Sequence, residues 1–417
     1  MSIRSNTFAR GLRLAGCAIA VLMPMINIAA ARAQSEAKPG TDRSSIEDLV
    51  KRVNAQEAQL KEVRSKLEAA RTEQDATELT AQNTDLPQDG YPRLQFHGFG
   101  DVDYRVSDQN GNHNSFLLGQ LDAFITSQLS ADFGILSETV IEANSENDFG
   151  IEIERLQFQW HPNDYFNLDF GRYHTALGYY NTAFHHGTWF QTAVGRPFFL
   201  DFEDGGGIIA AHNVGPSIHG AIPSGKWGLG YIFEIGNGRS YVPPGQEENL
   251  VLNVKDDNDY KAFNLAFISR PDWLSGLQFG AGIYNDTLTP PTLPRISEIM
   301  LHSHLVYKNS NWEFLSEGYL IRHKPRHEDD HWSSAGFIQL ARKFQEVTPY
   351  ARFSYLNASE SDAIYQIIQW NGRHYGPGIG VRWDFTNFAA FKLQYDYMQN
   401  TGESAVNSLT VQICFTF

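Results

Sequence analysis

The chain has 417 residues, a formal net charge of −15 at pH 7 and a negative mean hydropathy of −0.37, although 42% of its residues are hydrophobic. This acidic balance argues against nucleic acid as a partner, because a polyanion is repelled by an acidic surface. After residue 30 no apolar run is long enough for a membrane-spanning helix, so a membrane span in this chain would have to be a β-barrel.

Residues 1–33 have the pattern of a secretory signal peptide. Three arginines lie within the first 13 residues, an apolar stretch covers residues 14–28, and Ala31-Arg32-Ala33 forms a small-x-small cleavage site. The exported chain would retain only Cys414, which excludes an intramolecular disulfide.

The next stretch predicts a periplasmic coiled coil over residues 44–72, after a polar spacer at 34–43. Apolar residues recur there every three or four positions, which is a heptad pattern. The seam consists of Ile46, Leu49, Val53, Gln56, Leu60, Val63, Leu67 and Ala70. Such a helix favours self-association; we expect a homotrimer, and the seam also fits a dimer. A solitary amphipathic helix lying on another surface is the alternative. Residues 73–92, which contain Pro87, Gly90 and Pro92, predict a linker.

From residue 93 to residue 417 the chain consists of segments about as long as a tilted strand that crosses a bilayer. The predicted strands are 93–106, 115–129, 133–144, 149–160, 165–174, 205–222, 227–236, 259–270, 276–286, 297–308, 311–322, 331–343, 348–357, 375–385, 388–399 and 406–417. Long and short connections alternate between them, as in a barrel with both ends in the periplasm. A turn at 213–217 is the main alternative, and it would make the strand number odd.

The terminal strand shows the strict alternation that such a barrel requires. Its apolar face contains Leu409, Val411, Ile413, Phe415 and Phe417, and its other face is polar or small. Charged residues such as Glu234, Arg382 and Lys392 lie opposite the apolar faces of other strands. They would destabilise the packed core of a soluble sandwich, but they suit a water-filled lumen. We therefore predict an all-β fold, a transmembrane antiparallel barrel of about sixteen strands.

The connection at residues 175–204 is the longest and is too apolar for a solvated external loop. The candidate constriction residues in and beside it are Arg172, His174, Tyr179, Tyr180, His185, His186, Trp189, Arg196, Asp201, Glu203 and Asp204. The three acids either face Arg172 and Arg196 across the constriction or form a solvated loop end. Adjacent histidines in an extended chain point in opposite directions, so we expect no metal at His185 and His186. No cofactor is expected either.

Charges that face the lumen would set the ion preference of a pore. The candidate pore-lining residues are Arg105, Asp122, Arg155, His302, His304, Arg352, Arg382 and Lys392. Further acids share the inward faces, so neither sign dominates.

The strand pattern, the long third loop and the terminal Phe417 resemble those of trimeric porins from Gram-negative outer membranes. With the heptads, the chain is similar to porins that carry a periplasmic coiled coil, including relatives of the phosphate-selective family. The resemblance implies a homotrimer in outer-membrane lipid that passes small hydrophilic solutes or ions by diffusion. It also implies that the barrel-assembly machinery recognises Phe417. Two alternatives are a barrel enzyme at the outer membrane and a structural barrel that tethers this membrane to the cell wall.

Overall fold

The computed structural model describes residues 90–143, 149–184, 187–202, 206–241, 250–252 and 255–417. The chain divides into two units, Met1–Tyr91 and Pro92–Phe417, and the following description concerns the second unit. The predicted signal peptide, the coiled coil and most of the linker lie outside the described residues.

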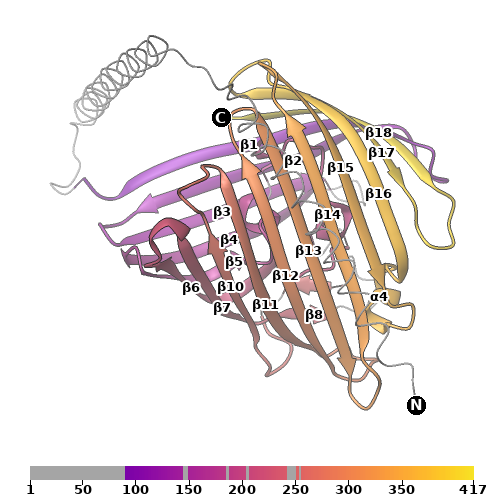
Figure 1. The fold of residues 1–417 in the computed structure, drawn as a ribbon, viewed down its shortest axis with the longest axis horizontal. Coiled ribbons are helices and arrows are strands. Elements are labelled where there is room, and N and C mark those ends of the chain that lie inside the picture. The colour runs from indigo at the N-terminus through magenta and orange to yellow at the C-terminus, as the bar shows by residue number, and fades with distance from the viewer. Residues whose placement is uncertain (1–89, 144–148, 185–186, 203–205, 242–249, 253–254) are drawn as a thin grey trace, which may run out of the picture. The chain divides into compact units, whose positions relative to one another are not determined.

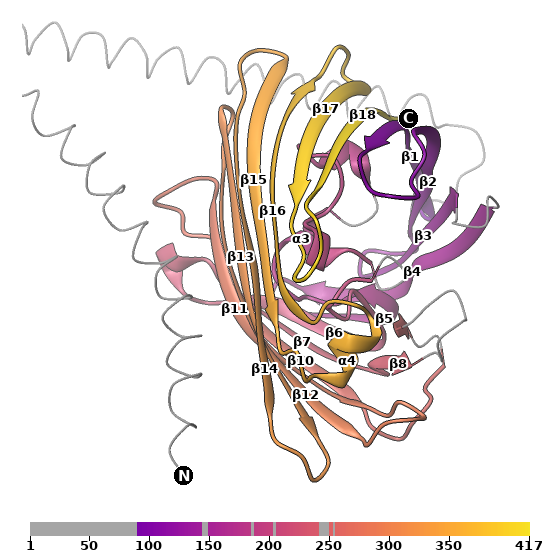
Figure 2. The same cartoon turned by 90° about the vertical axis from the view of Figure 1, so that its right-hand side faces the viewer.

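Sixteen strands of the second unit form one closed barrel in which every neighbouring pair is antiparallel (Figures 1 and 2). The strands are β1 (Arg93–Ser107), β2 (Ser115–Gln128), β3 (Phe133–Ala143), β4 (Phe149–Asn163), β5 (Phe166–His174), β6 (His212–Ile222), β7 (Leu229–Gly236), β10 (Ala262–Ser269), β11 (Leu277–Leu288), β12 (Ile296–Lys308), β13 (Trp312–Pro325), β14 (His331–Arg342), β15 (Val347–Ala358), β16 (Gly372–Trp383), β17 (Ala389–Met398) and β18 (Val406–Thr416). This confirms the predicted fold class.

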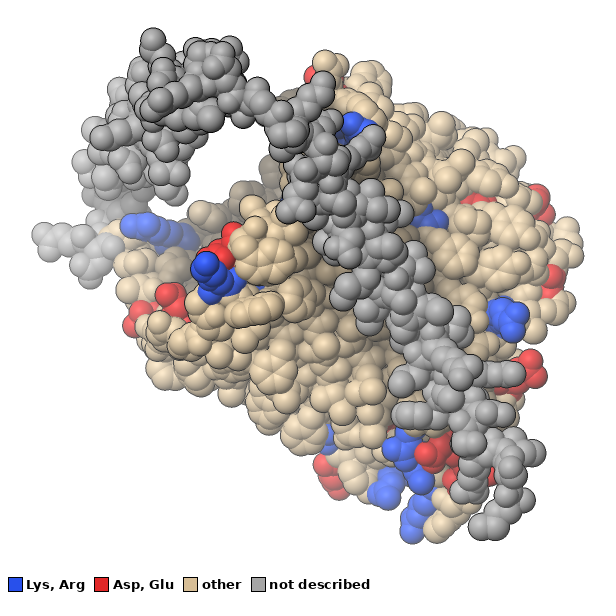
Figure 3. Space-filling view, viewed as in Figure 1, with Lys and Arg blue, Asp and Glu red and all other residues tan. Residues whose placement is uncertain are grey.

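Period-two alternation produces the two surfaces of the barrel. In β18, Leu409 and Ile413 are 40% and 46% exposed, whereas Thr410, Gln412 and Cys414 are buried. Large apolar side chains are exposed in the same way on most strands of the ring. Figure 3 shows one face of the barrel, where a broad uncharged area lies between charged side chains near its edges. A continuous apolar exterior of this kind suits contact with lipid.

The barrel closes where the end of the chain meets β1. The backbone N–H of Phe417 donates to the Gly98 carbonyl at 3.0 Å, and the Gly98 N–H donates to the Phe417 carbonyl at 2.8 Å. The Phe417 ring covers Gly98 so closely that an added Cβ would lie 2.2 Å from it. A larger residue at this position would displace the terminal ring from its present place.

The interior has two unlike sides. The apolar wall is formed by buried residues of β10–β15, namely Ala262, Tyr284, Met300, Val306, Leu315, Tyr319, Ile321, Ala335, Phe337, Leu356 and Ala358. The polar wall is formed by inward residues of β16–β18 and β1–β4, namely Asp101, Asp103, Asp122, Glu138, Arg155, Arg382, Lys392, Gln394 and Gln412. The sequence predicted inward charges, but it did not predict that one side would form a packed apolar core.

Two further details differ from the prediction. Strand β6 begins at His212 instead of residue 205, because residues 208–211 are buried apolar residues of the preceding connection. The possible turn at 213–217 is wrong, since this stretch lies within β6. A short hairpin of β8 (Arg239–Tyr241) and β9 (Leu250–Leu252), which was not predicted, lies in the connection after β7.

Short helices occur in the connections. They are α3 (Tyr180–Ala183), α4 (Ala363–Ile367), and the 3₁₀ turns η1 (Thr188–Phe190), η2 (Phe198–Leu200) and η3 (Gly225–Trp227). Among the described residues, no helix has both the length and the apolar character that a membrane span requires.

Candidate functional site

The 175–211 segment connects β5 to β6 and contains α3, η1 and η2. Its two flanking residues, His174 and His212, are direct partners in the β5–β6 ladder, so the segment leaves and returns at one place. Figure 2 shows α3 within the ring of strands. The contacts of this segment with both walls define the candidate site.

The first part of the segment is held through its backbone. The Ala176 N–H donates to the Glu234 carboxylate at 3.0 Å, and the Gly178 N–H donates to His302 Nδ1 at 3.1 Å. The Tyr180 N–H donates to the Glu317 carboxylate at 2.6 Å. Side chains from β7, β12 and β13 thus satisfy backbone donors that would otherwise be costly to bury.

Gly178 permits this close approach. Its φ is +75°, and a Cβ there would lie 2.0 Å from the Glu317 carboxylate and 2.3 Å from the Tyr319 hydroxyl. Only glycine adopts this backbone conformation readily while leaving that space free.

Apolar packing then fixes the segment on the apolar wall. Its fully buried members are Leu177, Tyr180, Phe184, Phe199, Leu200, Ile208, Ile209 and Ala210. The Tyr180 ring packs edge-on against Phe337, with ring centroids 5.6 Å apart. Burial raises the pKa of Tyr180 to about 12, so this hydroxyl remains protonated at neutral pH. This arrangement resembles the core of a soluble domain.

The middle of the segment meets the polar wall through backbone carbonyls. Lys392 Nζ donates to the Thr188 carbonyl at 2.8 Å, and Arg382 donates to the carbonyls of Trp189 and Gln191 at 2.7 and 2.8 Å. Such bonds from charged donors are stronger than neutral ones.

Further along the segment, the Val194 N–H donates to the Gln394 side-chain oxygen at 2.8 Å. Arg352 on β15 donates to the Gly195 carbonyl at 2.8 Å. Because Ala176 bonds to Glu234 on β7 and Val194 bonds to Gln394 on β17, the segment is bonded to strands on opposite sides of the ring.

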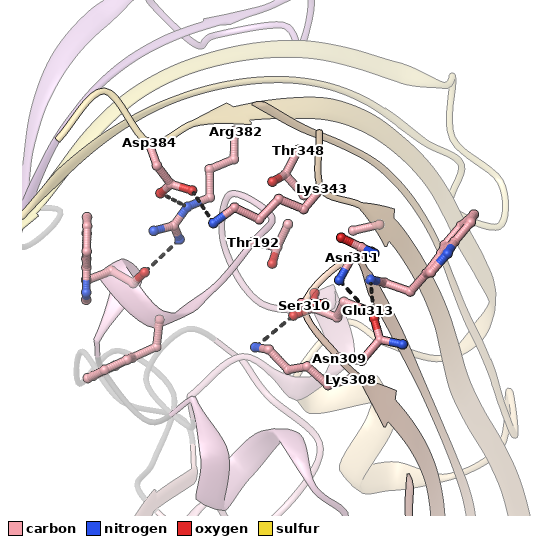
Figure 4. Close-up of a pocket in the computed structure, with 14 residues that line it drawn as sticks. Thr192, Lys308, Asn309, Ser310, Asn311, Glu313, Lys343, Thr348, Arg382 and Asp384 are labelled. Carbon is pink, nitrogen blue, oxygen red and sulfur yellow. Dashed lines mark hydrogen bonds and ion pairs between the residues drawn. The ribbon is translucent and has the colours of Figure 1, made fainter. Parts of the chain in front are cut away.

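A cavity of about 210 Å³ lies beside Trp189, Phe190 and Thr192, at the end of the barrel where the connections are short. Five charged side chains line it: Lys308, Lys343, Arg382, Glu313 and Asp384. Figure 4 shows that Lys343 and Arg382 both point toward Asp384. The N···O distances are 3.8 Å for Lys343 and 2.7 Å for Arg382, and Lys308 lies 3.0 Å from Glu313.

The predicted constriction residues lie in different surroundings. Tyr179 and Trp189 are half-buried, Trp189 beneath the Arg382 guanidinium at 4.9 Å, and His185, His186, Glu203 and Asp204 lie outside the described residues. Arg196 is buried within the segment, where it donates to the Leu200 carbonyl and to Asn181 and packs on the Phe202 ring. Arg172 lies beside Glu154 on β4, 4.0 Å away, and Asp201 is half-buried.

The predicted pore-lining residues also divide into groups. Arg382, Lys392, Arg352 and His302 bind the 175–211 segment, as described above. Arg155 pairs with Glu138 at 2.5 Å, Arg105 with Asp103 at 3.0 Å, and His304 with Gln278 at 3.1 Å, while Asp122 is buried.

Sequence reasoning placed Glu317 and Gln394 on inward strand faces but gave them no role in holding the loop, and it did not name Lys308 or Lys343. Their partners lie far away in the sequence, so no local spacing marks them. The alternation of apolar and polar residues along β13 and β17 is the sequence signal that places Glu317 and Gln394 on inward faces.

No protein-family model matches the sequence, and no curated protein matches it. Solved structures do match the barrel. An anion-selective porin from Comamonas acidovorans is 10% identical over 78% of this chain and 99% of the porin, with a TM-score of 0.54. The outer membrane channel DcaP of Acinetobacter baumannii is 8% identical over 80% of this chain and 100% of DcaP, also with a TM-score of 0.54.

A third match is the trimer form of OmpT, an outer membrane protein of Vibrio cholerae. It is 10% identical over 78% of this chain and 99% of OmpT, with a TM-score of 0.52. Identities this low establish the fold alone. The barrel therefore has the fold of Gram-negative outer-membrane porins.

Proposed function

We propose that the protein is a homotrimeric outer-membrane porin that passes small hydrophilic solutes or ions by passive diffusion. Residues 1–33 are the signal peptide, 34–43 a spacer, 44–72 a periplasmic coiled coil, 73–92 a linker and 93–417 the barrel. The 175–204 loop folds inward and narrows the lumen. The proposal needs no cofactor and no catalytic residue.

The main support is the 175–211 segment, which is bonded to both walls of one closed barrel. A segment that crosses the lumen in this way leaves a narrowed passage. The charged cavity beside Trp189 and Thr192 is a place where a solute would meet fixed charges. Fixed charges at such a point select ions by sign.

Three basic and two acidic side chains line this cavity, so we expect a mild preference for anions there. The anion selectivity of the Comamonas acidovorans porin is consistent with this expectation. The trimeric state is supported by the predicted heptads and by the trimer form of the OmpT structure.

The test is conductance of the purified, refolded protein in a planar lipid bilayer, with a salt gradient to obtain the reversal potential. We expect conductance steps in groups of three. Arg382→Gln removes a positive charge from the cavity, so it should move the reversal potential toward that of a cation-preferring pore.

The matched control is Arg342→Gln at the same end of the barrel. The Arg342 guanidinium packs on the rings of Trp312 and Phe344, and Arg342 does not line the cavity. This variant should leave the reversal potential unchanged.

A correctly folded barrel that does not conduct would overturn the proposal. The two remaining possibilities would then be separated by their own assays. Hydrolytic activity of the folded barrel would favour an enzyme. Loss of cell-wall association after deletion of residues 44–72 would favour a tether.

A further inference from the structure

Two buried histidines lie at the base of the 175–211 segment. Strand β5 pairs with β4 only as far as Arg172, which lies opposite Leu156. It pairs with β6 two residues further, as far as His174, which lies opposite His212. The imidazole rings are 4.7 Å apart at their centroids and inclined by 66°. They are 6% and 2% exposed, although histidines are often partly exposed.

Glu154 joins this pair from β4, where the strand carries an irregularity. The β3–β4 register shifts between Glu138 and Thr139, which pair with Arg155 and Ile153, so Glu154 is the extra residue of a β-bulge. Glu154 continues the inward face of Gly150 and Glu152. Glu154 is 1% exposed and its carboxylate contacts His212 Nε2.

We propose that Glu154, His174 and His212 form a binding site for a zinc-class divalent transition-metal ion. Each residue offers one ligand atom, and the three atoms lie within 4.8 Å of one another. Two imidazole nitrogens and one carboxylate oxygen are a common set for Zn²⁺, with a fourth position left for water or another ligand. Ca²⁺ and Mg²⁺ are unsuited, since they prefer oxygen ligands.

The surroundings supply the outer groups that such a site requires. The Glu138 carboxylate lies 4.0 Å from His174 Nε2, and the Phe202 ring stacks on the His212 ring with centroids 5.5 Å apart. A carboxylate beside a ligating histidine orients the ring and raises its basicity. An apolar ring beside the site limits the access of water.

Charged side chains surround the three proposed ligands. Asp122 interacts electrostatically with Glu138 and Glu154, and all three side chains are buried. Arg155 pairs with Glu138, and Arg172 lies 4.0 Å from Glu154. Glu138 and Glu154 thus each have a guanidinium nearby.

A second group of similar composition provides a comparison on the same three strands. Asp169 accepts a hydrogen bond from each side, from His161 at 2.8 Å and from His219 at 3.2 Å. The two histidine side chains are 39% and 35% exposed. Both carboxylate oxygens are thus occupied and water has access, so this group is a hydrogen-bonded triad and the weaker metal site.

The position of the proposed site has a structural consequence. His174 immediately precedes the 175–211 segment, and His212 immediately follows it. An ion held by these two residues and Glu154 would join both ends of the segment to β4. This inference is independent of the proposed porin function, because Zn²⁺ binding is measured without recording conductance.

The experiment uses the full exported chain without an affinity tag, refolded, stripped with a chelator and dialysed against Zn²⁺. Metal analysis should find a Zn²⁺ equivalent that the His174→Asn/His212→Asn variant lacks. The matched control, His161→Asn/His219→Asn, should retain it. Co²⁺ in place of Zn²⁺ should give the intense visible absorption of a tetrahedral site in the unmodified chain.

A second variant covers the case in which the double variant fails to fold. Glu138→Gln leaves all three ligands in place and should weaken Zn²⁺ binding by about 10- to 100-fold, as outer-shell changes do. Absence of bound Zn²⁺ in the unmodified chain would overturn the proposal. Loss of binding in the control pair alone, or unchanged binding in Glu138→Gln, would also overturn it.

Discussion

The two walls of the barrel interior hold the same segment by different physical means. The apolar wall mainly buries aromatic and aliphatic side chains such as Tyr180 and Phe199 against Phe337, although Glu317 and His302 of the same strands also accept backbone hydrogen bonds from the segment. The polar wall instead presents charged and amide side chains, and it binds backbone carbonyls through Lys392 and Arg382. Burial is non-directional and insensitive to salt, whereas the bonds of the polar wall depend on exact position.

The two walls therefore contribute differently to the placement of the segment. Apolar packing contributes most of the free energy that keeps the segment in place, because each large side chain loses contact with water. The polar wall sets the course of the stretch from Thr188 to Gly195 and leaves charged groups beside the cavity. Substitutions on the two walls should therefore have effects of different size and kind.

The largest effect is expected from Phe337→Ala on the apolar wall. Removing this ring leaves a cavity beneath Tyr180 and Phe199, and such changes cost about 3–5 kcal/mol. The segment should become sensitive to protease and the single-channel current should become noisier. Limited proteolysis and bilayer recording measure the two results.

Phe353→Ala is the matched control, since Phe353 is 46% exposed on the outer face of β15. It should leave both readouts unchanged. Equal protease sensitivity in the two variants would show that the apolar wall does not hold the segment.

A smaller effect is expected from Lys392→Met on the polar wall. The Lys392 ammonium is buried and donates to the Thr188 carbonyl at 2.8 Å. A hydrogen bond from a charged group contributes about 1.5–3 kcal/mol, and methionine preserves most of the side-chain volume. Cleavage of the segment should increase less than in Phe337→Ala.

Lys261→Met is the control, since the Lys261 side chain is 42% exposed and pairs with Asp256 near the protein surface. If Lys392→Met increased protease cleavage of the segment as much as Phe337→Ala does, the view that the two walls contribute unequally would be contradicted.

The smallest effect is expected from Lys343→Gln at the rim of the cavity. The Lys343 side chain is 51% exposed and lies 3.8 Å from Asp384. Exposed ion pairs contribute about 0–1 kcal/mol, so protease sensitivity should not change. The reversal potential should shift slightly toward cation preference at low salt, and the shift should shrink at high salt because the charge is screened. A shift of equal size at both salt concentrations would contradict this view.

Much of the fold could be predicted from local patterns. The alternation in Leu409 to Phe417 determined which side chains of β18 face outward, because a strand places successive side chains on opposite faces. The alternation of long and short connections determined the approximate strand number. The composition of the long connection after β5 also distinguished it from the other connections, because it is too apolar for a solvated loop.

Only the tertiary structure decided how that connection meets the barrel. The Tyr180 N–H bonds to Glu317, 137 positions away, and Lys392 bonds to the Thr188 carbonyl, 204 positions away. Such contacts depend on the register of every intervening strand pair in the closed ring, and a shift of one residue would turn each side chain to the other face. The apolar alternation of β4 changes phase between Ile153 and Leu156, which marks an irregularity in the sequence, but only the pairing with β3 decides that Glu154 is the extra residue and lies beside His212. The sequence therefore determined the surfaces of the individual strands, and closure of the ring decided which residues meet inside it.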